Sequence, residues 1–178
     1  QTDLFHLQRV DVEALAHELS RAHDIDALVM LSREVRSTAA SLLGQGTAAA
    51  PLTQLIATLD DLLTRRILEI EIRISGIDFG HACWLALGSE GRFEQTLHSD
   101  QDNALVWRDG YAPPADLQAI CDRFSDALAQ FGYPPCAGHI MVNNPDWRDS
   151  ASDFTRRVRQ WQLLSDGDAL MNLAIFLD

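Results

Sequence analysis

The chain has few of the residues on which several classes of protein depend. Its 178 residues include three cysteines, Cys83, Cys121 and Cys136, without C-x-x-C spacing, so neither a disulfide framework nor a zinc site follows. Basic residues number 14 against 26 acidic ones, and the net charge of −12 argues against a non-specific nucleic-acid binder. No run of about 18 apolar residues is present, which excludes a membrane-spanning segment. We therefore expect neither a nucleic acid nor a membrane as a partner.

What remains is an ordinary globular composition, with 47% hydrophobic and 22% charged residues. A chain of this size buries roughly 70% of its unfolded surface, enough for a core without covalent staples. No signal peptide opens the sequence and the cysteines show no pairing pattern, so we expect a reduced, cytoplasmic compartment. The chain starts with Gln1 and stops on Asp178 in a segment that reads as a strand, and we interpret it as a piece of a longer protein.

The first third of the chain is predicted to be helical. Apolar residues recur at helical spacing, Asp24 is placed to cap a second helix, and the glycines at 44 and 46 end that helix. Pro51 opens a long third helix that runs to about Ser75-Gly76. We interpret these stripes as the faces of a helical bundle. Residues 1–77 are therefore predicted to be an N-terminal helical region.

The pattern changes near residue 78, where short apolar runs alternate with helical stretches. Strands are expected at 82–87 and 104–107, with a helix opened by Pro113-Pro114 and ended by Gly132. We expect another short strand at 136–142, helices around 154–161 and 169–173, and a final buried strand at 174–177. The order of elements predicts an α/β (α+β) core at 78–178 with a helical annex.

One segment carries recognisable chemistry. Gly88-Ser89 lies between a strand and a short helix, where a glycine lets the backbone approach a phosphate and the serine hydroxyl adds a donor. Asp100 and Asp102 are two residues apart in an expected strand, so they share a face. Two carboxylates aimed at the pocket of a Gly-Ser turn predict a Mg²⁺ site for phosphoryl chemistry.

Other residues near this segment allow two interpretations. Arg92 is placed either to contact a triphosphate or to form a salt bridge with Glu90 or Glu94. His98 forms a His-x-Asp-x-Asp trio with the two acids, although hard Mg²⁺ prefers oxygen ligands. The arginines at 156, 157 and 159 form either a solvated helix face or a phosphate or partner contact. The four tryptophans are expected to pack in the core or between domains rather than to stack on a base.

These motifs resemble a known family. Leu87-Gly88-Ser89-Glu90-Gly91-Arg92 followed by Asp100-Gln101-Asp102 resembles the DNA polymerase beta superfamily of nucleotidyltransferases. The closer resemblance is to the bacterial nucleotidyltransferases called domain of unknown function 294, found beside CBS and cyclic-nucleotide-binding domains and similar to the uridylyltransferase that modifies the PII signalling protein. It covers roughly residues 30–178 and includes Asn144-Pro145-x-Trp147 and the closing Ile175-Phe176-Leu177-Asp178.

The resemblance implies a small mixed sheet of the polymerase-beta type, in which Asp178 is a third acid at the end of the last strand. Asp178 would then bind metal and help to deprotonate the attacking hydroxyl. Longer relatives carry a C-terminal helical domain thought to hold the substrate, and we expect this chain to stop before it. Polar Gln101 and Asn103 fit the closer family, while Phe93 and His139 depart from its expected residues.

The resulting hypothesis is a nucleotidyltransferase domain dependent on Mg²⁺ or Mn²⁺. An NTP binds at Gly88, Ser89 and Arg92, the acids Asp100, Asp102 and Asp178 form the metal and catalytic site, and an NMP passes to a hydroxyl acceptor with release of pyrophosphate. Analogy with the PII enzyme suggests that the acceptor lies on a signalling protein. The alternative is a non-catalytic module on the same fold that senses nucleotides or docks a protein. The base, the acceptor and the oligomeric state stay open.

Overall fold

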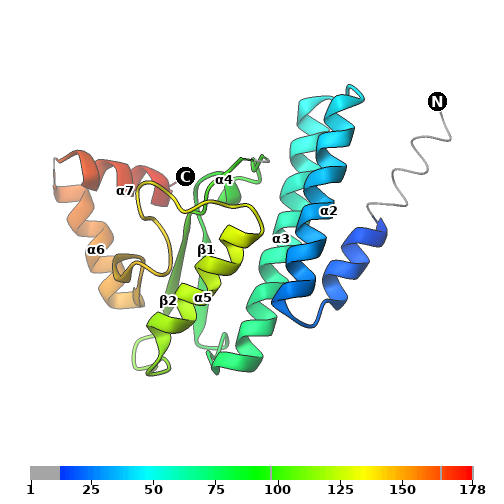
Figure 1. Cartoon of the computed structure of the whole chain (residues 1–178). Helices are drawn as coiled ribbons and strands as arrows, with labels where there is room; N and C mark the ends of the chain where they lie inside the picture. Colours follow the sequence, from blue (N-terminus) through cyan, green and yellow to red (C-terminus); the bar gives the residue numbers. More distant parts are fainter. Residues whose placement is uncertain (1–12, 97, 165, 178) are drawn as a thin grey trace.

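The structure, a computed structural model, describes residues 13–96, 98–164 and 166–177. A long helical hairpin stands at one end, a small sheet lies in the middle, and two helices close the other end (Figure 1). A short helix at 13–21 precedes the other elements. The remaining elements, in chain order, are α2 (Ile25–Gly44), α3 (Ala49–Ser75), β1 (Ala82–Ala86), α4 (Gly88–Gly91), β2 (Asn103–Trp107), α5 (Leu117–Gln130), the 3-10 helix η1 (Pro145–Trp147), β3 (Arg148–Ser150), α6 (Ala151–Leu163) and α7 (Gly167–Leu177).

The predicted N-terminal helices are confirmed. Asp24 caps α2 by accepting a hydrogen bond from the Ala27 amide at 2.8 Å, and α2 ends at Gly44 as the glycine pair indicates. Helix α3 begins two residues before Pro51, within the first turn, where a proline costs no hydrogen bond. The apolar stripes of α2 and α3 pack against each other, and a cluster of Ala39, Leu42, Leu52 and Ile56 closes the far tip of the hairpin.

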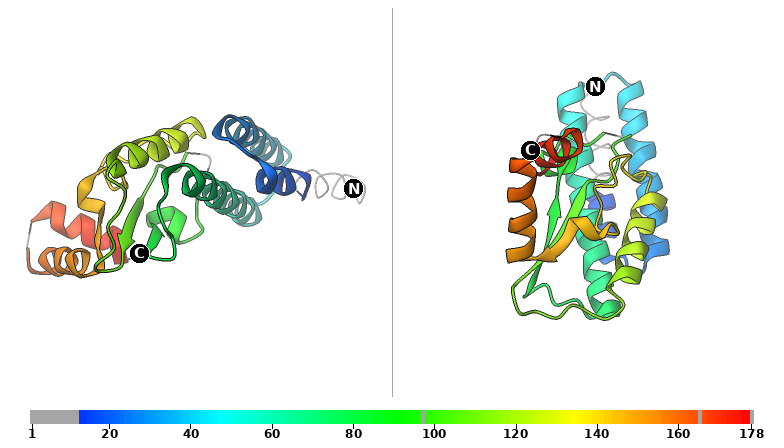
Figure 2. Two further views of the ribbon diagram at one scale, coloured as in Figure 1. Left: turned by 90° about the horizontal axis from the view of Figure 1, so that it is seen from below. Right: turned by 90° about the vertical axis from the view of Figure 1, so that its left-hand side faces the viewer.

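Arg36 fastens the hairpin to the rest of the molecule. Its Nε donates to the Phe131 carbonyl at 2.8 Å and its guanidinium lies 5.0 Å from the centre of the Tyr133 ring. Helices α2 and α3 lie along α5, as the views in Figure 2 also show. One apolar cluster contains residues from both sides of residue 77, among them Ile67 and Phe124. The division into 1–77 and 78–178 stays a prediction.

The sheet has the order β1-β2-β3, with β1 antiparallel and β3 parallel to β2. Side chains alternate between its two faces. Trp84 and Leu105 face the cluster shared with α5 and the hairpin, whereas Leu85 and Ala104 face the cluster under α6 and α7. The small mixed sheet and the helical annex confirm the predicted α+β class.

Two predicted strands are wrong. Residues 174–177 form the last turn of α7, whose first turn Asp166 caps by accepting from the Ala169 amide at 2.7 Å. A short apolar run does not reveal its secondary structure, and here Ile175 and Phe176 pack as helix residues against the cluster of Trp161 and Phe154. Residues 136–142 form turns and irregular backbone, and β3 takes the place beside β2 instead.

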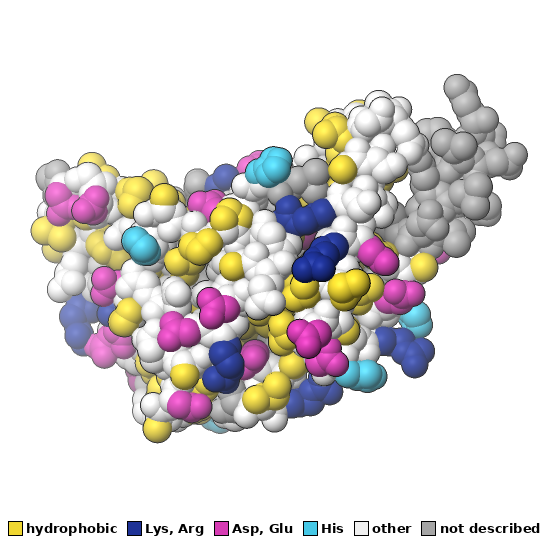
Figure 3. All heavy atoms as spheres, viewed as in Figure 1, with side chains coloured by type: hydrophobic (Ala, Val, Ile, Leu, Met, Phe, Trp, Pro, Cys, Tyr) yellow, Lys and Arg dark blue, Asp and Glu magenta, His cyan; other side chains and the backbone are white. Residues whose placement is uncertain are grey.

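The surface carries the charge that the composition predicts. Figure 3 shows one face over which acidic side chains are spread, with fewer basic ones between them. Among the described residues, no helix combines the length and the apolar character that a membrane crossing requires.

Candidate functional site

The turn after β1 is built around Gly88. Its φ is +54°, a left-handed conformation that L side chains rarely adopt. A Cβ at this position would lie 2.4 Å from Oδ2 of Asp102, far inside van der Waals contact. Glycine is therefore required for two reasons: the backbone conformation and the close approach of the Asp102 carboxylate.

The two acids expected to hold a metal lie close together, but the predicted strand that was to place them on one face is wrong. Strand β2 begins only at Asn103, so Asp100 and Asp102 lie on the irregular segment before it. This segment is held in place because the Leu87 amide donates to the Asp102 carbonyl at 2.9 Å. Donor atoms of Asp100, Asp102 and Cys136 lie within 4.8 Å of one another. In the described part of the chain, this is the group of residues placed to hold a cation, and neither His98 nor Glu94 belongs to it.

The surroundings of the Asp102 carboxylate are suited to binding a cation. Burial raises the pKa of its carboxyl and the negative charge of Asp100 raises it further, while a hydrogen bond from Cys136 and the charge of Arg92 oppose the rise. Its Oδ1 is buried without a hydrogen-bond partner among the described residues. An unpartnered carboxylate oxygen beside a second acid costs free energy that a bound cation offsets. The residues present therefore fit a divalent ion.

Arg92 forms the predicted salt bridge with Glu94 and also interacts electrostatically with Asp102. Its Nε lies 2.7 Å from Oε2 of Glu94, and both side chains reach solvent. Its positive charge also lowers the pKa of Asp102, which places it in the field of the candidate site. Contact with a phosphate stays a prediction. So do the metal-binding and nucleotide-binding roles of Asp100, Asp102, Gly88 and Ser89.

The amides on either side of Asp102 position the acidic segment. Gln101 is buried, and its Nε2 donates to the carbonyls of Ser125 at 3.0 Å and Tyr133 at 2.8 Å. Asn103 is also buried; its backbone N–H donates to the Ile140 carbonyl, and its Oδ1 accepts from the Val142 amide at 2.8 Å. The amide side chains thus bind the segment to α5 and to the loop that carries Cys136.

Two acidic side chains where α3 meets α4, the buried Asp60 and the half-buried Glu90, were not predicted as part of the site. Glu90 accepts a hydrogen bond from Thr64 of α3 at 3.2 Å, and Asp60 of α3 accepts one from the Tyr133 hydroxyl. Burial is the main cause that raises the pKa of each carboxyl to about 7, and the charge of Asp60 adds to the rise at Glu90. No local pattern in the sequence signals the contact of α3 with the turn after β1, because Thr64 and Glu90 are 26 residues apart in the chain.

Phe93 and His139, the two residues that depart from the family pattern, both adopt a left-handed backbone conformation. Phe93 and His139 are the non-glycine residues with positive φ in the described chain, at +55° and +53°. Glycine is favoured at such positions because a Cβ crowds the backbone there, and histidine adopts them more often than phenylalanine does. Phe93 is 54% exposed, on the turn that follows α4.

Asp178, the implied third acid, lies outside the described residues. The strand expected to deliver it is instead the end of α7. Its role as a catalytic and metal-binding acid stays a prediction.

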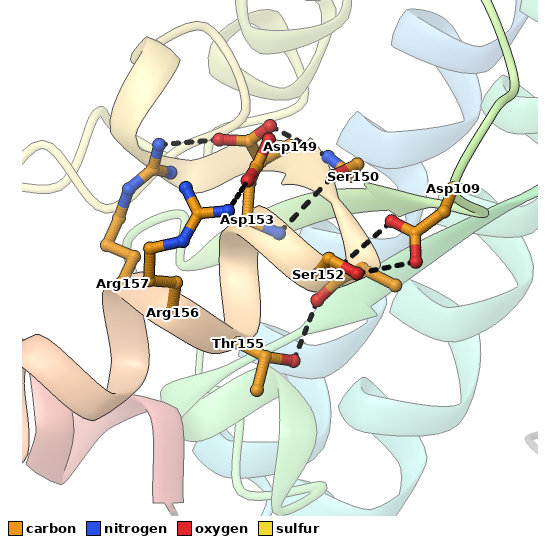
Figure 4. A network of polar contacts seen from close by, with 9 residues as sticks. Asp109, Asp149, Ser150, Ser152, Asp153, Thr155, Arg156 and Arg157 are labelled. Atoms are coloured by element: carbon orange, nitrogen blue, oxygen red, sulfur yellow. Dashed lines mark hydrogen bonds and ion pairs between the residues drawn. The ribbon is translucent and has the colours of Figure 1, made fainter.

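The arginines of α6 are largely engaged with neighbouring acids. Arg156 pairs with Asp153 at 2.5 Å and Arg157 with Asp149 at 2.8 Å, while Asp109 accepts from Ser152 at the start of the helix (Figure 4). These contacts favour the solvated helix face over a phosphate site.

The tryptophans serve packing, as predicted. Trp147 and Trp161 are buried with ring centres 5.0 Å apart, and Trp84 packs on Phe124 at 4.1 Å.

Comparison with known proteins completes the description of this site. A family model described as "Putative nucleotidyltransferase DUF294" matches residues 33–167, which is more than half of the chain and contains the Gly-Ser turn, both acids and Cys136. No curated protein and no solved structure matches the chain. The extent of the family match confirms the resemblance inferred from the motifs, and the chain belongs to the DUF294 family of nucleotidyltransferases.

Proposed function

We propose that this chain transfers an NMP from an NTP to a hydroxyl acceptor and releases pyrophosphate. Family membership supports nucleotidyl transfer in general. The observation that carries the specific proposal is the convergence of Asp100 and Asp102, in which Oδ1 of Asp102 is buried without a hydrogen-bond partner among the described residues and Oδ2 lies against Gly88. Mg²⁺ or Mn²⁺ is the proposed cofactor because carboxylate oxygens are the ligands these ions prefer.

Each residue of the site has a proposed task. Asp100 and Asp102 hold the cation, which when bound neutralises charge on the phosphates. The backbone at Gly88, the Ser89 hydroxyl and the Arg92 guanidinium bind phosphate oxygens and orient the triphosphate. By resemblance to the superfamily, Asp178 completes the acidic site and accepts the proton of the attacking hydroxyl.

The chemical balance of the reaction is simple. The acceptor oxygen forms a bond to the α-phosphorus as the bond from that phosphorus to the bridging oxygen breaks, and pyrophosphate leaves with that oxygen. The contribution of the protein is mainly positioning and charge stabilisation. By analogy with the PII enzyme, we propose a hydroxyl on a signalling protein as the acceptor and uridylyl or adenylyl transfer as the reaction.

Thermal unfolding with each of the four NTPs, with and without Mg²⁺, tests the site. A ligand at about 100 times its Kd adds about 2.7 kcal/mol, a rise in Tm of roughly 5–10 °C for a chain of this size. We expect such a rise with Mg²⁺ and one NTP, and its loss in Asp102→Asn. Asp126→Asn makes the same change at an exposed position of α5 and should keep the rise. Equal rises in both variants would contradict the assignment.

A second measurement separates transfer from sensing. Pyrophosphate release with candidate acceptor proteins is expected for a transferase. Mg²⁺-dependent binding without any release would instead favour the non-catalytic nucleotide-sensing module.

A further inference from the structure

A sulfur atom lies in the cluster of acidic oxygens. Sγ of Cys136 is within 4.8 Å of carboxylate oxygens of both Asp100 and Asp102. Cys136 is buried, and it hydrogen-bonds to the Asp102 carboxylate. The other cysteines are placed differently: Cys83 is exposed on β1 and Cys121 is buried on α5, and neither belongs to this cluster.

The loop around Cys136 holds the sulfur firmly. The neighbouring Pro135 is bridged to Gln101, next to both acids, and the His139 amide donates to the Cys136 carbonyl at 3.0 Å. The amides of Gly138 and Ile140 donate hydrogen bonds to the sulfur itself. Two backbone donors stabilise a negatively charged sulfur, and outer-shell hydrogen bonds of this kind orient metal ligands. Burial is the main factor that raises the pKa of the thiol, to about 11.

We infer that Cys136 is the third protein donor of the Asp100–Asp102 site and that this site also takes a thiophilic divalent cation such as Zn²⁺, Cd²⁺ or Co²⁺. Sulfur ligands favour these ions over Mg²⁺, which is bound by oxygen. The unpartnered Oδ1 of Asp102 independently indicates that a cation would be stabilised in this cluster. As the metal–sulfur bond forms, the thiol proton leaves to solvent, and the three donors then carry a total charge of −3.

The choice of metal follows from this donor set. Mg²⁺ prefers oxygen ligands, so the carboxylates of Asp100 and Asp102 would be its protein ligands at this site. A thiophilic ion gains the sulfur as a third ligand, and it should therefore displace Mg²⁺ from the same acids. The inference shares Asp100 and Asp102 with the proposed function, but it concerns which ions bind and needs no turnover.

Cobalt absorption tests the inference on the whole chain, because sulfur-to-Co²⁺ charge transfer absorbs in the near ultraviolet. Cys83→Ser serves as the background, since it removes the exposed thiol. In that background we expect the band to appear with Co²⁺ in the presence of Mg²⁺, and equimolar Zn²⁺ to abolish it. Cys136→Ser should remove the band and weaken Co²⁺ or Cd²⁺ binding at least about tenfold, the lower end of the effect of losing an outer-shell partner. Cys121→Ser is the matched control and should keep the band.

The outcomes distinguish this inference from the proposed function. Absence of the band in the background protein, or its survival in Cys136→Ser, would overturn the role of the sulfur even if Mg²⁺ and an NTP still raise the Tm. A band that depends on Cys136 and is lost in Asp102→Asn supports the inference even if no NTP binds. Survival of the band in Asp102→Asn would refute a site shared with the acids without relying on any variant at Cys136.

Discussion

Replacing Gly88 by alanine probes the contact on which the candidate site depends. Two costs are expected. The left-handed backbone, at φ +54°, costs an alanine about 1–2 kcal/mol. The new Cβ would also lie 2.4 Å from Oδ2 of Asp102, whereas ordinary contacts begin near 3.4 Å, so the carboxylate must move by about 1 Å. A displacement of about 1 Å at a reacting site can cost roughly 100-fold in rate.

A matched control separates these two costs. Gly110 has φ +84° and no atom within 4 Å of the Cβ that alanine would add, so Gly110→Ala carries the backbone cost alone. Gly110→Ala should lose about 1–2 kcal/mol, which corresponds to a fall in Tm of roughly 2–8 °C, and Gly88→Ala should lose at least as much.

Only Gly88→Ala should also lose Mg²⁺-dependent stabilisation by the NTP, because only there does the Asp102 carboxylate move. Calorimetric unfolding with and without Mg²⁺ and nucleotide measures both quantities. If Gly88→Ala keeps the same Mg²⁺-dependent rise as Gly110→Ala, the close approach of Asp102 to Gly88 has no role in binding and the reasoning is refuted.

Two further predictions concern the surroundings of the site. The pKa of Glu90 is raised to about 7, so its contribution to stability is present below its ordinary pKa of 4.5 and is lost as the pH rises through about 7. Urea unfolding at pH 5 and pH 8 should show that Glu90→Gln removes up to about 3 kcal/mol of this pH dependence, while exposed Glu34→Gln does not; equal slopes would contradict the burial of a titrating Glu90. Gln101→Met should cost about 1–3 kcal/mol in the same assay, because it leaves the carbonyls of Ser125 and Tyr133 without their donor, and an unchanged midpoint would show that these hydrogen bonds do not stabilise the fold.

Local patterns predicted much of the architecture. The hairpin of α2 and α3 follows from apolar residues at helical spacing, a capping aspartate and terminal glycines, all of which act within a few residues of one another. Strands β1 and β2 follow from apolar runs bounded by turn residues. The two acids and the Gly-Ser turn were found because each is a short motif of neighbouring residues and because both resemble a family motif.

Local patterns failed where the partner decides the conformation. The run at 174–177 suits a strand or a helix equally, and the packing of α7 on Phe154 and Trp161 selects the helix. Strand β3 is only three residues long, and its extended conformation depends on pairing with β2. A segment this short has too weak an intrinsic preference for the β conformation to be predicted as a strand from the sequence.

The sequence by itself determined the fold class, the helical annex, the turn at Gly88 and the two acids, because each depends on near neighbours in the chain. Only the tertiary structure brought Cys136 to Asp102, placed Glu90 against Thr64 of α3, and showed that Gln101 and Asn103 bind the acidic segment to α5 and the Cys136 loop. These pairs are separated by more than 20 residues. Their meeting is decided by which apolar faces pack together, and burial on packing then sets their pKa values and hydrogen bonds.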